Sequence, residues 1–395
     1  MKKKPLTIGL FGLGVVGSGL LEVLKDSGYP DAVIRKICVK TPGKTRAVPQ
    51  ELLTFNPSDI LDDPSIDTVV ETINGSDDAF DIVSRAMRQG KNVVTANKKM
   101  LAGNFELLLN LQEATGVSLL YESAACGSIP IVRTLEQHFG TEPLEQLSGI
   151  FNGTSNYILS RMFDGNLDFD TALRQAQQAG FAEEDPASDI DGLDAKYKLI
   201  LLTAHSHGMI LSPDQVPHFG IRHLRPEDIR FARDRGLRIK LLPVCRRTGP
   251  GRLAVYVIPG LVGDADELFR VDDEFNGVLL QSDYSGAQFL RGRGAGGRPT
   301  GSALLSDLLS LQQGYRYAYQ KHRMNGSTVL DDQYKLRIYA RAPSEIPLQA
   351  LPFPSPENIT RDGNTYVIES EVTLSHLGRQ ARWLQENEVF VMRML

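Results

Sequence analysis

The chain has 395 residues, of which 42% are hydrophobic, enough for two or three domains that each bury a sizeable core. Its 43 lysines and arginines against 48 aspartates and glutamates give a net charge of −5, so no bulk positive field is present to hold nucleic acid or an anionic membrane. The three widely spaced cysteines argue against a disulfide framework and a thiolate zinc site. We therefore expect a cytoplasmic protein that acts on small molecules.

The N-terminus resembles a secretory signal, because three lysines precede the apolar stretch 6–24. Five glycines between Gly9 and Gly19 interrupt that stretch, and no small-x-small cleavage site follows it. A strand, a turn and a helix explain it better. No other apolar run approaches the ~18 residues that a membrane span requires.

The first part of the chain alternates between strand and helix patterns. The predicted strands are 6–11, 33–39, 68–72, 92–95 and 118–121, and the predicted helices are 15–24 and 77–89. This alternation predicts a Rossmann-type parallel sheet, so the fold class is α/β, and residues 1–132 form a dinucleotide-binding domain.

The pattern then changes to that of an α+β domain with a partly open sheet over residues 133–300. We expect strands at 147–151, 238–244, 253–258 and 277–281, and helices at 155–163 and 195–207. A helix at 302–319, within the segment 301–325, returns to the nucleotide domain. Residues 326–395 form a small α+β module with strands 334–341, 365–373 and 388–394 and a helix at 376–386.

The motif Gly12-x-Gly14-x-x-Gly17 stands between the first strand and the first helix. The first glycine permits a tight turn, the second lets a pyrophosphate approach the backbone, and the third permits close helix packing. A purely structural glycine turn is the alternative. The second strand ends at Lys40, with Lys44 and Arg46 behind it, where an acid would take the ribose 2′-OH of NAD. We predict a preference for NADP(H) over NAD(H), and a solvated basic loop is the alternative.

The acidic loop 183–194 fails as a calcium hand, since aligning Gly192 with the invariant glycine puts Lys198 where the bidentate glutamate belongs. Asp194 and Lys198 stand four residues apart on one helix face. The apolar residues 199–202 follow without a break, so the helix is buried there and an ammonium held by an acid becomes a plausible proton donor. A surface ion pair is the alternative. Asn152-Gly153-Thr154 opens a helix and could receive a carboxylate, although an ordinary N-cap would look the same.

Six motifs together resemble the homoserine dehydrogenase family over about residues 5–320. They are GLGVVGSG, TANK (95–98), YESAACGSIP (121–130), FNGTSNYIL (151–159), EEDPASDIDGLDAKYKL (183–199) and GRGAGGRPT (292–300). The resemblance implies reversible, NAD(P)H-dependent reduction of L-aspartate 4-semialdehyde to L-homoserine in threonine and methionine biosynthesis. It also implies a homodimer, with residues 133–300 as its catalytic and dimerisation domain. The early start of the nucleotide fold suggests a monofunctional enzyme without a fused aspartate kinase.

The resemblance assigns roles to individual residues. Lys198 resembles the acid/base lysine, Asp194 the residue that holds this lysine and the substrate amine, and Lys98 a second lysine at the cofactor and the reacting carbon. Further substrate-binding positions are Glu183, Asp189, Gly153 and Thr154. The cofactor-binding positions are Gly12, Gly14, Val15, Val16, Gly17, Lys40, Thr72, Lys98, Glu183 and Gly294. A monovalent cation, usually sodium, is expected at Glu122, Ala125, Gly127 and Ile129. The segment 294–297 would close over the cofactor.

Several positions depart from the family. Phe181 replaces a tyrosine often found near the substrate, and Cys126 replaces a smaller residue of the cation loop. Residues 264–267 lack the His-Pro often seen there. The tail has the length of an ACT-type regulatory domain, but five prolines between 343 and 356 forbid the helix that such a domain needs after its first strand. We expect this degenerate module to add stability or dimer contacts rather than to sense threonine.

There are two other hypotheses about the function. A dehydrogenase of the dihydrodipicolinate reductase or glucose-fructose oxidoreductase type also has an N-terminal nucleotide domain, but does not predict the Asp194/Lys198 helix together with Asn152-Gly153-Thr154. A catalytically dead nucleotide sensor would lack the active-site groups, which are intact here.

Overall fold

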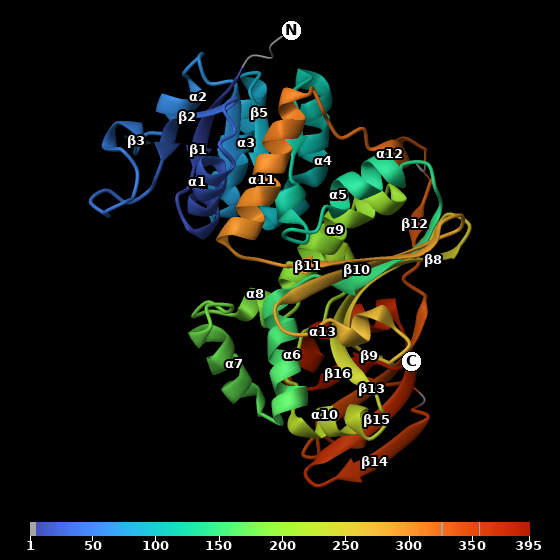
Figure 1. Cartoon of the computed structure of the whole chain (residues 1–395). Coiled ribbons are helices and arrows are strands. Elements are labelled where there is room, and N and C mark those ends of the chain that lie inside the picture. Colours follow the sequence, from blue (N-terminus) through green and yellow to red (C-terminus); the bar gives the residue numbers. More distant parts are fainter. Residues whose placement is uncertain (1–4, 325–326, 355) are drawn as a thin grey trace. The chain divides into compact units, whose positions relative to one another are not determined.

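The computed structural model describes residues 5–324, 327–354 and 356–395 (Figure 1). The chain divides into two compact units. Unit 1 comprises the chain up to Gly140 together with Arg293–Gln320, and unit 2 comprises Thr141–Gly292 and Lys321–Leu395. No helix in the described ranges has both the length and the hydropathy to cross a membrane.

These units divide the chain differently from the predicted domains. The first boundary follows Gly140 instead of residue 132, and the return to unit 1 starts at Arg293 instead of 301. The predicted boundary at 325/326 falls on residues outside the described ranges, as do the three N-terminal lysines. Residues from 327 onward belong to unit 2 and do not form a unit of their own.

Unit 1 is built on a six-stranded sheet with the strand order β3-β2-β1-β4-β5-β6, in which every pairing is parallel. The strands are β1 (Leu6–Phe11), β2 (Ala32–Cys38), β3 (Leu53–Thr54), β4 (Thr68–Glu71), β5 (Asn92–Thr95) and β6 (Leu119–Leu120). The helices are α1 (Val15–Ser27), α2 (Ser58–Leu61), α3 (Ser76–Arg88), α4 (Lys98–Thr115), α5 (Ile131–Arg133) and α11 (Gly297–Gln312). The predicted Rossmann-type fold is confirmed.

The strand order reverses direction between β1 and β4. Because parallel crossovers are right-handed, the connection from β1 to β2 and the connection from β4 to β5 place their helices on opposite faces of the sheet. Accordingly α1 packs on α11, and α3 packs on α4 (Figure 1). Ligands of such sheets bind at the strand ends where the order reverses, which here are the ends of β1 and β4.

Helices α1 and α11 touch backbone to backbone through three glycines. A Cβ atom on Gly19 would overlap the backbone of Gly297, and a Cβ atom on Gly301 would lie 2.5 Å from the carbonyl carbon of Gly19. Gly297 in turn lies against the carbonyl oxygen of Val15. Gly297, which belongs to the motif 292–300, therefore serves the packing of α11 on α1.

Unit 2 contains a ten-stranded mixed sheet with the main order β11-β10-β7-β8-β9-β16-β13-β15-β14, and β12 pairs with β9. The strands are β7 (Leu144–Ile150), β8 (Arg238–Gly249), β9 (Arg252–Val262), β10 (Phe275–Ser282), β11 (Gly286–Arg293), β12 (Val329–Leu330), β13 (Lys335–Pro343), β14 (Asn358–Asp362), β15 (Thr365–Thr373) and β16 (Phe390–Arg393). The helices are α6 (Gly153–Gly165), α7 (Phe169–Gln178), α8 (Ala187–Ile190), α9 (Leu193–His207), α10 (Pro226–Arg233), α12 (Gln320–Met324) and α13 (Leu374–Glu386).

The C-terminal strands continue the sheet of the preceding domain. Strand β16 pairs with β9 in parallel and with β13 in antiparallel orientation. One hydrophobic core spans both regions, since Leu242 and Tyr256 belong to the same buried cluster as Ile338, Ile368 and Leu384. The module 326–395 therefore shares its core with the rest of unit 2.

Some predicted elements differ from the structure. The helix expected at 302–319 ends at Gln312, because Gly314 has a φ of +78° and the following tyrosine-rich segment leaves the helix. Helices α4, α7 and α10 and strands β11 and β14 were not predicted. Among the described residues of the proline-rich segment after β13, the one helical element is a short 3-10 turn at Leu348–Ala350, in agreement with the prediction that prolines forbid a helix there.

Candidate active site

The glycine loop of unit 1 has the geometry that a pyrophosphate needs. Gly12 has a φ of +92°, and a Cβ atom there would lie 2.8 Å from the carbonyl oxygen of Thr72. A Cβ atom on Gly17 would overlap the carbonyl oxygen of Gly12, whereas one on Gly14 would meet nothing within 4 Å. Gly14 is the N-cap of α1, so the first amides of the helix, at Val15 and Val16, lie at the positive end of the helix dipole.

Thr72 fixes this loop from the neighbouring strand end. Its hydroxyl donates to the carbonyl oxygen of Phe11 at 2.9 Å, and its amide donates to the same oxygen at 2.8 Å. The glycine loop, which lies where the strand order reverses, is therefore held in place by the residue that follows β4.

The basic residues after β2 differ in their contacts. The side chain of Lys40 is 92% exposed, and its ammonium lies 3.8 Å from Asp78, whose side chain is 70% exposed, so this ion pair is weak. Arg46 donates to the carbonyl oxygens of Thr41 and Lys44, both at 2.9 Å, and so holds its own loop together. Lys40 and Lys44 are the exposed cations at this strand end.

Lys98 is the first residue of α4, and the preceding Asn97 is its N-cap. The Asn97 side chain accepts from the Met100 amide at 3.0 Å and donates to the carbonyl oxygens of Ile73 and Gly75 at 3.1 and 3.3 Å. This carboxamide therefore ties the start of α4 to the end of β4 and positions Lys98 at the same edge of the sheet as the glycine loop.

Glu71 is a fully buried carboxylate at this edge. It accepts hydrogen bonds from the Thr95 hydroxyl at 2.5 Å and the Ile73 amide at 2.7 Å. Burial raises its pKa from 4.5 to about 7, against the opposing effect of these hydrogen bonds. Neither the motifs nor the family resemblance singled out Glu71.

We expect the buried Glu71 carboxylate to make stability depend on pH. The unfolded chain loses this proton near pH 4.5 and the folded chain near pH 7, so the free energy of unfolding falls as the pH rises between those values. Glu71→Gln removes this contribution and stabilises the protein above pH 7 by up to about 3 kcal/mol. Urea unfolding of both proteins at about pH 5 and pH 8 tests this; an equal difference at both pH values would contradict it.

In the predicted cation loop, the carboxylate of Glu122 is already hydrogen-bonded within the protein. The Glu122 carboxylate accepts from the amides of Val132 and Arg133 at 2.7 and 2.9 Å and lies 3.3 Å from the Arg133 guanidinium. Most of the acceptor capacity of the Glu122 carboxylate is therefore used within the protein, and its backbone carbonyl also accepts from the Ala125 amide at 3.2 Å. This side chain caps α5.

The rest of the loop is built around Gly127, whose φ is +63°. A Cβ atom there would lie 2.5 Å from the carbonyl oxygen of Gly294, and the Ser128 amide donates to Arg293 at 3.0 Å. Gly294 therefore lies against the cation loop. The carbonyl oxygens of Ala125, Gly127 and Ile129 are the donor type that a hard cation takes, although the Ile129 oxygen also accepts from Ile131 at 2.8 Å.

The centre of the candidate substrate site lies in unit 2, on α9. The Lys198 ammonium lies 2.7 Å from Asp194 and donates to the Phe151 carbonyl oxygen at 2.7 Å. Both side chains are buried, with 8% and 4% of their surface exposed. Residues 199–202 are buried as well, so the pair is not a solvated surface ion pair. An ammonium has three N–H groups, and these two contacts leave one for a further acceptor.

Asn152 joins the acids of this cluster. Its side-chain nitrogen donates to Asp189 at 2.7 Å and to Asp194 at 2.9 Å, while its oxygen accepts from the Ser155 amide and caps α6. The sequence indicated the N-cap but not the bridge between the two carboxylates. One side chain therefore aligns the acids with the N-terminus of α6.

Gly153 and Thr154 begin α6. A Cβ atom on Gly153 would lie 2.7 Å from the carbonyl oxygen of Glu274, so glycine is required there by close packing. The Thr154 hydroxyl donates to the carbonyl oxygen of Phe181 at 2.6 Å, and the Phe181 ring packs on Tyr157. The Glu183 side chain is exposed, outside the buried cluster of Asp194 and Lys198.

Asn276 on β10 is a further residue of the site that the sequence analysis missed. Its side chain is fully buried and donates to the Phe151 carbonyl oxygen at 3.0 Å, the same oxygen that accepts from Lys198. No short motif marks it, because the contact joins residues far apart in the chain. Asn276 therefore helps to fix the oxygen that orients Lys198.

Comparisons with known proteins identify the family of the chain. The family model of homoserine dehydrogenase matches residues 130–309, and that of its NAD-binding domain matches residues 12–122. A homoserine dehydrogenase of Bacillus subtilis is 35% identical over 353 residues, which are 87% of this chain and 79% of that protein. One from Synechocystis is 38% identical over 314 residues, 77% of this chain and 72% of that protein.

Solved structures share the whole fold, including the C-terminal strands. A homoserine dehydrogenase from Thiobacillus denitrificans superposes with a TM-score of 0.85 at 31% identity, covering 99% of this chain and 98% of that one. One from S. aureus gives a TM-score of 0.73 at 28% identity and covers 99% of each chain. The chain therefore belongs to the homoserine dehydrogenase family and is an NAD(P)-dependent oxidoreductase of amino-acid biosynthesis.

Proposed function

We propose that the chain catalyses the reversible reduction of L-aspartate 4-semialdehyde to L-homoserine, with Lys198 as the proton donor. The observation that carries this role is the buried Lys198 ammonium, which is held by Asp194 and the Phe151 carbonyl oxygen and keeps one N–H group for an acceptor. A carbonyl oxygen that gains negative charge is such an acceptor. Positioned general acids contribute roughly 10² to 10⁴ in rate.

When bound, the reduced nicotinamide supplies a hydride to the aldehyde carbon. Lys198 donates its proton to the aldehyde oxygen as the carbon–oxygen double bond becomes single, and the product is a primary alcohol. Asp194 stabilises the ammonium before transfer, and Asn152 holds Asp194 in place. In the oxidation direction the neutral amine of Lys198 takes the hydroxyl proton.

The substrate is a zwitterion and needs groups of both signs. Asp189 and Asp194 offer carboxylate oxygens to its ammonium, and Glu183 supplies a further negative charge from the exposed loop. The first amides of α6, at Gly153 and Thr154, form a helix N-terminus suited to its carboxylate. On the cofactor side, the loop from Gly12 to Gly17 suits the pyrophosphate, and Lys98 stands at the same sheet edge.

The test of this function is a spectrophotometric assay of L-homoserine oxidation with NADP and with NAD. We expect cofactor reduction that depends on L-homoserine and is absent with L-serine, whose shorter side chain puts the hydroxyl out of reach of Lys198. Equal turnover of both alcohols, or none of homoserine, would contradict the proposal.

We expect NADP to be preferred over NAD. Lys40 and Lys44 are exposed cations at the end of β2, where a 2′-phosphate would lie, and no acid occupies the usual ribose position at Lys40. Lys40→Ala should lower kcat/KM with NADP by about tenfold and leave kcat/KM with NAD nearly unchanged. A higher kcat/KM with NAD in the unaltered enzyme, unaffected by this substitution, would overturn the prediction.

We further propose a sodium ion on the carbonyl oxygens of Ala125, Gly127 and Ile129, in a homodimer. The oxygen donor set and the tight turn at Gly127 support the cation, and the resemblance to the family supports the dimer. Because Glu122 already caps α5, this cation would have a structural role in fixing the loop beside Gly294.

We expect no feedback inhibition by threonine. The described part of the segment between β13 and β14 has no α-helix, so the effector pocket of an ACT-type domain is incomplete, while strands β13 and β16 extend the sheet of unit 2. Initial rates of the full-length enzyme should therefore be unchanged by L-threonine at sub-millimolar concentration. Saturable inhibition in that range would show that the module is regulatory.

A further inference from the structure

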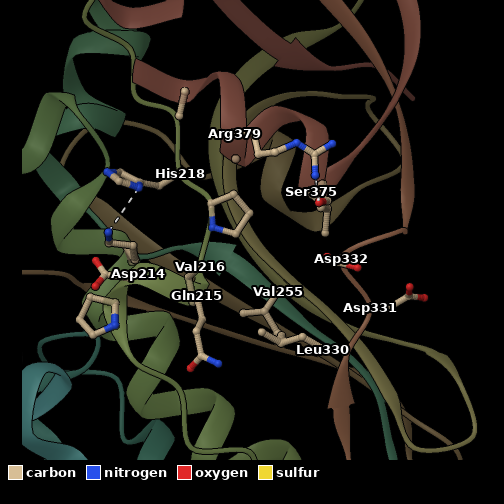
Figure 2. A pocket seen from close by; sticks show the side chains of 16 residues that line it. Asp214, Gln215, Val216, His218, Val255, Leu330, Asp331, Asp332, Ser375 and Arg379 are labelled. Carbon is tan, nitrogen blue, oxygen red and sulfur yellow. Dashed lines mark hydrogen bonds between the residues drawn. The ribbon is translucent and has the colours of Figure 1, made fainter. Parts of the chain in front are cut away.

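Unit 2 contains a pocket of about 400 Å³ that lies apart from the Asp194–Lys198 pair. Its walls come from α9, the segment 213–218, strands β9 and β12, and the start of α13 (Figure 2). The volume falls in the range of about 300–1,000 Å³ that is typical of small-molecule sites. The function proposed above makes no use of this pocket.

The buried charge in this pocket is Lys196. Its side chain is only 6% exposed, and its ammonium lies 3.3 Å from Nδ1 of His218. Burial, reinforced by the nearby Lys196 charge, lowers the pKa of His218 to about 4, so the imidazole is neutral at physiological pH and its Nδ1 can accept the hydrogen bond. Among the described residues, no carboxylate lies within ion-pair distance of Lys196. The charge of Asp214 acts to raise the pKa of Lys196, but burial outweighs it and the pKa is lowered. The Tyr197 ring lies 6.0 Å from the ammonium, and His218 is its hydrogen-bond partner, so the buried charge is poorly compensated.

The remaining lining is mostly apolar. Val216, Val255 and Leu374 are buried side chains of the wall, and Leu330 is half-buried. Arg379 and Ser375 lie on the other side of the pocket from His218 (Figure 2), joined by a hydrogen bond of 2.6 Å. The pocket thus combines cationic groups with a small aliphatic surface.

The described acids of the lining form no ion pair with Lys196, and Asp214 acts on its charge only from a longer distance. Asp331 is paired with Arg252 at 2.9 Å and accepts from the Thr248 hydroxyl at 2.7 Å. Asp214 and Asp332 are exposed at the rim, where solvent screens them. The buried end of the pocket is therefore the positive one.

We propose that this pocket binds a small aliphatic carboxylate, whose anionic group contacts Lys196 and whose branched apolar body contacts Val216, Val255 and Leu374. A carboxylate would complete the hydrogen bonding of the Lys196 ammonium, and charge-assisted hydrogen bonds of this kind are strong. One source of this group is a simple aliphatic carboxylic acid in its ionised form. An apolar α-amino acid carries the same carboxylate, and the exposed Asp214 could contact its ammonium.

The pocket and the candidate active site share helix α9. Successive helix residues turn by about 100°, so Lys196 projects from nearly the opposite side of α9 to Asp194 and Lys198, each two residues away. A ligand that contacts Lys196 therefore packs on the back of the helix that presents the proton donor.

The test is isothermal titration calorimetry of the full-length protein with isobutyrate, L-valine, isobutyramide and inorganic phosphate. We expect saturable binding of isobutyrate or L-valine, and none of the neutral amide or the phosphate. Lys196→Met should weaken carboxylate binding about tenfold or more. The matched control is Lys335→Met, which removes an exposed lysine of β13 that is paired with Glu371, outside the pocket.

A second variant guards against misfolding of Lys196→Met. A Cβ atom on Gly378 of α13 would meet only the Cβ atom of Pro217, at 3.9 Å, so Gly378→Leu is accommodated and fills the pocket with Lys196 intact. This variant should keep the wild-type circular dichroism spectrum and lose carboxylate binding. The proposal is overturned if neither carboxylate binds, if isobutyramide or phosphate binds as tightly, or if both variants bind like the wild type. Because the experiment measures binding and not turnover, a negative result would refute the pocket proposal without bearing on the proposed dehydrogenase activity.

Discussion

Replacing Lys198 by alanine should lower kcat at least about 10²-fold and change KM much less. The ammonium of this residue is the buried proton donor, and the proton is transferred only in the transition state, so its loss raises the barrier of the chemical step. Steady-state kinetics of homoserine oxidation measure both parameters. Circular dichroism and a thermal melt show whether the variant keeps its fold, since Asp194 loses a partner but retains the Asn152 hydrogen bond.

Lys98→Ala is the control for this assignment. Lys98 stands at the start of α4 in unit 1, and the same kinetic experiment separates the two lysines. A fall confined to KM in Lys198→Ala would mean that Lys198 only binds the substrate. A kcat abolished only in Lys98→Ala would reverse the roles of the two residues.

Replacing Arg341 by methionine should destabilise the whole protein by about 3–5 kcal/mol. Arg341 on β13 and Asp228 on α10 form an ion pair at 2.9 Å in which neither side chain has any exposed surface, and Tyr339 donates to Asp228 at 2.8 Å. Removal of one partner leaves an uncompensated buried charge. Urea unfolding, followed by circular dichroism, measures the loss of stability.

The matched control for Arg341 is Arg382→Met on α13. Its ion pair with Glu386 is exposed, so its loss should change the free energy of unfolding by less than about 1 kcal/mol. An equally small effect of Arg341→Met would show that β13 contributes little to unit 2, against the shared core described above.

The sequence predicted those features that depend on neighbouring residues. The turn at Gly12 and the helix beginning at Val15 follow from glycine spacing, and the contact between Asp194 and Lys198 follows from their separation of four residues on one helix. The family, the Rossmann-type fold and the nicotinamide cofactor are confirmed by the comparisons. The roles of individual site residues stay predictions.

Features that depend on long-range packing were not predictable. Asn276 and Lys198 meet at the Phe151 carbonyl oxygen across three separate segments of the chain, and no local pattern indicates such a contact. Likewise the C-terminal strands have a pattern of their own, so the sequence suggested a separate module. The pairings of β12 and β16 with β9, together with the common core, show that they complete the sheet of unit 2.

The fate of the transferred hydride tests the proposed reaction most directly. L-aspartate 4-semialdehyde is incubated with the enzyme and NADPH that carries deuterium at both positions of the nicotinamide C4, and the product is analysed by mass spectrometry and NMR. We expect L-homoserine with a single deuterium on its hydroxymethyl carbon, formed at a rate that Lys198→Ala lowers at least about 10²-fold. Unlabelled homoserine, or unchanged semialdehyde in the presence of the wild-type enzyme, would contradict it.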